Sequence, residues 1–255
     1  MCDPPGPSPI GSFLELVAAQ QAGGIPLGSA YGPRPDVPPV YSRRAFQAGM
    51  LRAAARGGSF ATSGGKRRIE WMPAAICMLR GVNVGGHNSI KMESLRRMCE
   101  SLGLRGAQTY VQSGNVVFKT TARDLSQLAK RIETKIEQTY GFRPTVIIRS
   151  TSELREVIGK NPFASRSGIE PSRLLVTFLA THPAPEVRDK MLGIKADPEE
   201  LRIVGREVYA YFPNGIGRAK LSPALIERTL KTPGTGRNWN TVTKLLEMAE
   251  KLEAS

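Results

Sequence analysis

The chain has 255 residues, enough for one large domain or two small ones, and its 36 lysines and arginines against 22 acidic residues give a formal net charge of +14. That excess favours polyanionic partners such as nucleic acid, or small anionic ligands, although a protein can also be basic without binding either. No apolar run is long enough for a membrane span, no signal peptide is recognisable, and the three cysteines lack paired or metal-type spacing, so we expect a protein of the reducing cytoplasm.

The composition changes sharply near residue 72. Residues 1–71 contain 9 of the 19 prolines and 11 of the 26 glycines, which is unfavourable for a packed core. We expect this segment to be mostly disordered, with short helices at about residues 13–21 and 43–56. Because Met72 directly precedes the first strong strand pattern, a sharper hypothesis makes it the true start and residues 1–71 a misassigned extension. The alternative is a genuine disordered basic tail.

From Met72 onward, apolar residues alternate between strand-like runs and helical spacing. The six predicted elements are a strand at 76–80, a helix at 92–102, strands at 108–112 and 115–119, a helix at 125–140 and a strand at 145–149. Their order, β-α-β-β-α-β, is that of a ferredoxin-like unit.

The pattern then partly repeats. The predicted elements are a short helix from residue 151, a strand at 173–180, a helix at 186–192, strands at 201–204 and 207–212, and helices at 223–230 and 239–252. The last strand of a second unit is missing from the pattern, and the final helix takes its place. We therefore predict an α+β fold, in which a ferredoxin-like half (72–150) is followed by a second, partly repeated α+β half (151–255) with a C-terminal helix.

Four polar loops combine glycine with asparagine, arginine or lysine, at residues 80–88, 112–115, 214–220 and 234–240. Glycine lets a backbone approach a ligand closely, and arginine can grip a phosphate in two places. The first loop joins a strand to a helix, a geometry that brings backbone N–H groups close to an anion. The candidate ligand-binding residues are Arg80, Asn83, Gly85, Gly86, His87, Ser113, Gly114, Asn115, Lys220, Arg237, Asn238 and Trp239.

These loops also have a purely structural interpretation. They match neither a P-loop nor a dinucleotide fingerprint, and their glycines can simply shape tight turns. The asparagines can act as turn or cap residues, and a lone tryptophan at a helix start is more often buried than stacked on a base. His87 has no acidic or nucleophilic partner near it in sequence, so no catalytic residue, cofactor or metal-ligand set can be assigned.

Four longer motifs carry a resemblance to a known family. They read LRGVNVGG at 79–86, TYVQSGNVVF at 109–118, NPF at 161–163 and RNWNTV at 237–242. Together they resemble the bacterial family of domain of unknown function 1697, over the chain from about Met72 to the end. The resemblance implies a ferredoxin-like α+β fold. It supplies no established activity and no catalytic residues.

The leading functional hypothesis is a cytoplasmic protein that binds nucleic acid or another phosphate-bearing ligand where the four loops meet in one cleft. A second hypothesis is a small enzyme for an anionic metabolite, with Arg80, Lys220 and Arg237 as anion clamps and His87 as acid or base. A third is an interaction module whose loops are wholly structural. The sequence leaves the oligomeric state open.

Overall fold

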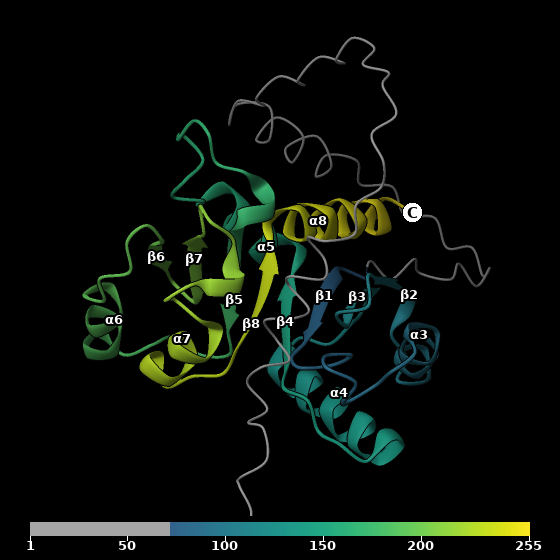
Figure 1. Cartoon of the computed structure of the whole chain (residues 1–255). Coiled ribbons are helices and arrows are strands. Elements are labelled where there is room, and N and C mark those ends of the chain that lie inside the picture. Colours follow the sequence, from purple (N-terminus) through teal and green to yellow (C-terminus); the bar gives the residue numbers. More distant parts are fainter. Residues whose placement is uncertain (1–71) are drawn as a thin grey trace, which may run out of the picture. The chain divides into compact units, whose positions relative to one another are not determined.

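Residues 72–255 are described by the computed structural model, and they form two four-stranded antiparallel sheets with helices packed against them (Figure 1). The predicted α+β class and the two-half layout are confirmed. The expected disorder of residues 1–71, and the short helices at 13–21 and 43–56, lie outside the described residues.

The first half has the predicted β-α-β-β-α-β order. Its elements are β1 (Ala74–Leu79), α3 (Met92–Ser101), β2 (Arg105–Tyr110), β3 (Asn115–Lys119), α4 (Leu125–Tyr140) and β4 (Val146–Ser150). Their order in the sheet is β2-β3-β1-β4. Helix α4 begins where the Asp124 side chain accepts bonds from two backbone N–H groups, and it ends at Gly141, whose φ of +77° suits a residue without a side chain.

The second half follows the same plan after helix α5. Its elements are α5 (Thr151–Gly159), η1 (Pro171–Arg173), β5 (Leu174–Leu179), α6 (Pro185–Leu192), β6 (Glu200–Val204), β7 (Glu207–Tyr211), η2 (Ile216–Arg218), α7 (Pro223–Leu230), β8 (Gly234–Asn238) and α8 (Trp239–Ala254). The sheet order, β6-β7-β5-β8, reproduces that of the first half.

The prediction that the second unit lacks its last strand was wrong. Residues 234–238, expected in a loop, form β8 and pair with β5 from Leu179↔Gly234 to Leu175↔Asn238. Thr235 is the one β-branched residue of this segment, which has no apolar side chain, so its pairing comes from tertiary contacts. Its glycines permit close packing, because a Cβ on Gly234 would lie 2.8 Å from the Thr177 methyl group.

Alternate residues of β1 and β5 serve two different cores. Ala75, Cys77 and Leu79 pack with α3 and α4 on the outer side of the first sheet, and Leu175 packs with α6 and α7 on the outer side of the second. Between them lies a central core that contains Ile76 of the first sheet, Val176 of the second and Leu245 of α8. Both β1 and β5 are therefore buried on both faces, which explains their continuous apolar sequences.

The C-terminal helix α8 joins the halves. It contacts β1 and β3 of the first sheet and β5 and β8 of the second, and it packs against α5. At its far end, Glu253 accepts a hydrogen bond of 3.0 Å from the backbone N–H of Ala74 and one of 2.8 Å from the Thr151 hydroxyl. The last helix of the chain is thus tied to the first strand of the described part.

Strand registers make the halves equivalent position by position. Met78 of β1 faces Asn115, the first residue of β3, just as Phe178 of β5 faces Glu207, the first residue of β7. Residues 100 apart in β1 and β5 therefore occupy corresponding places. By the same criterion, the register pair Ile76↔Arg149 corresponds to Val176↔Arg237.

Replacing Thr177 by valine should stabilise the protein. The Thr177 hydroxyl is buried and has no hydrogen-bond partner among the described residues, whereas valine has nearly the same shape and no polar group. We expect the free energy of unfolding in urea to rise by about 1 kcal/mol. The matched control is Thr235→Val, because the Thr235 hydroxyl bonds to Leu79 and Arg237. A gain in the control, or a loss in Thr177→Val, would contradict the assignment.

Candidate functional site

The loop after β1 and the β2–β3 turn are held together by Asn83. Its side-chain amide donates to the carbonyl oxygens of Ile90 (2.9 Å) and Gln112 (2.8 Å), and its Oδ1 accepts from the Ile90 N–H (2.8 Å). Two of the predicted loops therefore meet. Asn83 itself is a structural clamp, with a φ of +56° that asparagine tolerates better than most residues.

The tip of the first loop is a tight turn that stays exposed. Gly85 and Gly86 have φ of +57° and +77°, and the His87 N–H bonds to the Val84 carbonyl at 3.1 Å, as in a type I′ turn. Residues 85–89 are exposed, and the His87 imidazole has no hydrogen-bond partner within residues 72–255. The glycines thus shape a turn, as the structural interpretation expects, yet the turn presents a free surface.

A strained valine lies at the neighbouring tip. Val111 has φ of +50° and is 40% exposed, although a β-branched side chain is strongly disfavoured in the left-handed region. Asn83 holds the adjacent Gln112 beside the first loop. Residues 85–89 and 111–112 together form the exposed surface that we call the loop face.

Behind the loop face the space is filled. A Cβ on Gly114, where φ is +74°, would lie 2.5 Å from Val82 Cγ2 and 2.9 Å from Leu79 Cβ. Asn115 is fully buried and donates to the Tyr110 carbonyl and the Ser113 hydroxyl, both at 3.0 Å. Gly114 and Asn115 are therefore packed inside the protein, against Val82 and Leu79.

Arg237 lies in this packed region and uses all five of its N–H groups. Burial lowers the pKa of its guanidinium to about 10. Its acceptors are Asn115 Oδ1, Thr235 Oγ1 (2.7 Å) and the carbonyl oxygens of Gly236 (2.8 Å), Leu79 (2.8 Å) and Ser113 (3.0 Å). Arg237 thereby ties β8 to the first half and has no donor left for a phosphate.

The remaining predicted residues are dispersed. Asn238 caps α8 by accepting from the Thr241 N–H at 2.9 Å, and Trp239 is half-buried against the central core. The Lys220 ammonium donates to the Asp197 carbonyl at 2.9 Å. Arg80 is half-exposed and pairs with Glu227 through two bonds of 2.7 and 2.8 Å.

Arg237→Met should cost about 2–4 kcal/mol of the free energy of unfolding, because it leaves several buried acceptors without a donor. The matched control, Arg80→Met, removes a half-exposed ion pair and should cost less than about 1 kcal/mol. Urea unfolding followed by circular dichroism measures both. Equal losses in the two variants would show that Arg237 is not the tie described above.

Val111→Gly should stabilise the protein by about 1 kcal/mol, since glycine adopts φ of +50° without strain and the lost side chain is partly exposed. The matched control is Leu192→Gly in α6, which gives the ordinary cost of glycine at an exposed apolar position. Thermal unfolding measures both, and a lowered Tm in Val111→Gly would contradict the strain.

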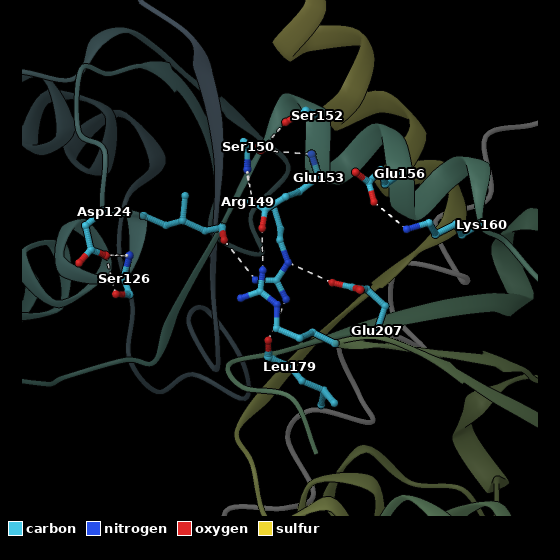
Figure 2. A network of polar contacts seen from close by, with 12 residues as sticks. Asp124, Ser126, Arg149, Ser150, Ser152, Glu153, Glu156, Lys160, Leu179 and Glu207 are labelled. Carbon is cyan, nitrogen blue, oxygen red and sulfur yellow. Dashed lines mark hydrogen bonds and ion pairs between the residues drawn. The ribbon is translucent and has the colours of Figure 1, made fainter. Parts of the chain in front are cut away.

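A cavity of about 230 Å³, which the sequence did not predict, lies between α5 and the β6–β7 turn. We call it the α5 hollow. Its charged lining residues are Arg149, Glu153, Glu156, Lys160, Arg206 and Glu207, several of which appear in Figure 2, and His182 lies beside them. These lining residues come from three stretches of the chain, 149–160, 182 and 206–207, so no single local motif could have indicated the cavity.

Arg149 forms the base of the α5 hollow and is only 2% exposed. It donates to Glu207 Oε1 (3.0 Å) and to the carbonyl oxygen of Leu179 (2.8 Å), as Figure 2 shows. It also donates to the carbonyl oxygen of Ile148 (3.1 Å). Burial lowers the pKa of Arg149, and the Glu207 carboxylate opposes that shift. These three hydrogen bonds use three of the five N–H groups of Arg149 and leave two.

Two further ion pairs line the walls. Arg206 pairs with Glu153 at 2.6 Å, and Lys160 pairs with Glu156 at 2.7 Å. Arg206, Glu153 and Arg149 also border a second cavity of about 260 Å³ that extends along β4 toward α4. The α5 hollow therefore has a mixed, nearly balanced charge, unlike a simple anion site.

Comparison with known proteins gives the family. The model of a protein family of unknown function, DUF1697, matches residues 72–209. The chain belongs to this family. The match confirms the resemblance found in the motifs, and it covers all of the first half and most of the second sheet.

One solved structure similar to this DUF1697 chain is that of the conserved bacterial protein SP0830 from Streptococcus pneumoniae. The two are 24% identical, with a TM-score of 0.56, and the alignment covers 70% of this chain and 99% of that one. At that identity the likeness concerns the fold alone. No curated protein matched the sequence. Within residues 72–255 of this DUF1697 chain, no helix is long and apolar enough to cross a membrane.

Proposed function

We propose that the protein binds a phosphate-bearing ligand, RNA or DNA, on the loop face. The observation that carries the proposal is the exposed turn at its tip. Among the described residues, no acceptor pairs with the backbone N–H groups of Gly85, Gly86 or Asn88. Unpaired N–H groups in a glycine-rich turn after a strand are suited to an anion.

Charge and rigidity support the proposal. Residues 72–255 contain 28 lysines and arginines against 18 acidic residues, a formal excess of ten. Arg80 is the first residue of the first loop, and exposed Lys91 follows the loop. The Asn83 clamp fixes the loop before a ligand arrives, which reduces the entropy that binding must overcome. Arg237, Gly114 and Asn115 support this surface from behind and are not part of the proposed contact.

The test is fluorescence anisotropy of labelled single-stranded RNA and duplex DNA with the full chain, between 50 and 300 mM salt. If about three phosphates are contacted, log K should fall with log salt with a slope of about −2 to −3. Lys91→Glu should weaken binding at least tenfold, because it reverses a charge beside the tip. It should not unfold the protein, since an acidic residue suits a helix start.

The matched control is Lys251→Glu at an exposed position of α8, which makes the same change of net charge elsewhere. It should weaken binding much less than Lys91→Glu. Equal effects of the two variants would mean that only overall charge matters. Undetectable binding at 50 mM salt would refute the proposed function.

A further inference from the structure

The α5 hollow and the packed region behind the loop face occupy corresponding places in the two halves. The Leu79 N–H bonds to the Gly114 carbonyl, and the equivalent Leu179 N–H bonds to the Arg206 carbonyl, so Arg206 corresponds to Gly114. By strand register, Glu207 corresponds to Asn115. The same architecture therefore surrounds both regions.

The two regions differ in what fills them. In the first half, Val82 is 2% exposed and packs onto Gly114, so the space is closed by an apolar side chain. Three residues beyond the equivalent Leu179, the second half has His182 instead, and this residue is exposed. The apolar plug is replaced by an imidazole beside a charged turn, and a cavity of about 230 Å³ remains.

The charges of the α5 hollow select one class of ligand. A simple anion would meet three carboxylates, and a simple cation would meet three basic side chains. At the base, however, Arg149 retains two N–H groups, and Glu207 uses one carboxylate oxygen for Arg149. A small molecule with both charges can satisfy the two groups at once without leaving either unpaired.

We propose that the α5 hollow binds a small zwitterion of amino-acid size, with its carboxylate toward Arg149 and Arg206 and its ammonium group toward Glu207. His182 closes the ligand from the solvent side, in the place that Val82 fills permanently in the first half. The volume of about 230 Å³ suits a small molecule such as a free amino acid. This site is separate from the loop face, so it stands or falls independently of nucleic-acid binding.

The test is thermal unfolding of the full chain with each of the twenty standard amino acids at 20 mM. Acetate and ethylammonium at the same concentration control for each charge alone. At least one amino acid should raise Tm by roughly 5–10 °C when present at about a hundred times its Kd, and neither control ion should do so.

Two variants introduce into the second half the residues that close the corresponding space in the first half, Val82 and Gly114. His182→Val and Arg206→Gly each change an exposed or half-exposed residue, and both should fold and lose most of the shift. The control His87→Val changes the other histidine of the chain and should retain the full ligand-induced rise in Tm. The proposal is overturned if no amino acid moves Tm by more than 1 °C, if a control ion gives the same shift, or if both hollow variants retain it.

Discussion

Two buried arginines hold the halves of this protein together, because each donates hydrogen bonds to the other half. Arg149 lies in the last strand of the first half and donates to the carbonyl oxygen of Leu179 in the second. Arg237 lies in the last strand of the second half and donates to the carbonyl oxygen of Leu79 in the first. Each cation is costly to bury, and the bonds that offset that cost come largely from the other half. Neither half can therefore satisfy its own arginine alone.

The two arginines differ in the residue that accepts the hydrogen bond from their Nε. The partner is Asn115 for Arg237 and Glu207 for Arg149. Arg237 meets neutral Asn115, and the surrounding space is packed shut by Val82. Arg149 meets the Glu207 carboxylate beside an open cavity. The two halves thus contain the same buried-arginine position, once in β4 and once in β8. One copy braces the loop face from behind, while the other keeps the space and the charges that a small ligand would need.

The sequence predicted elements well where local pattern and tertiary environment agree. Helix α4 has apolar residues at helical spacing, an acidic cap and a terminal glycine, and its expected limits were confirmed. Strand β8 was not predicted, because Gly-Thr-Gly-Arg-Asn has a loop composition and becomes a strand only by pairing with β5. The hidden strand also concealed that the second half is a complete repeat of the first.

The candidate sites were harder to predict because residue type does not reveal direction. Asn83 and Arg237 carry ligand-binding chemistry, but the fold turns their polar atoms inward, where they bond to the protein itself. The exposed tip at Gly85 and Gly86 could be predicted from its glycines. The α5 hollow could not, since Arg149 and its partner Glu207 are 58 residues apart, and only the internal repeat brings out their importance.

Native-state hydrogen exchange tests most directly whether the reciprocal arginines make one cooperative unit of the two sheets. Cys77 of β1 and Val176 of β5 are fully buried in different sheets, so we expect their amides to be among the slowest to exchange in each half. If the halves depend on each other as described, these amides should report the same free energy of opening, within about 1 kcal/mol. A sheet that opens several kcal/mol more easily while the other stays protected would contradict that mutual dependence.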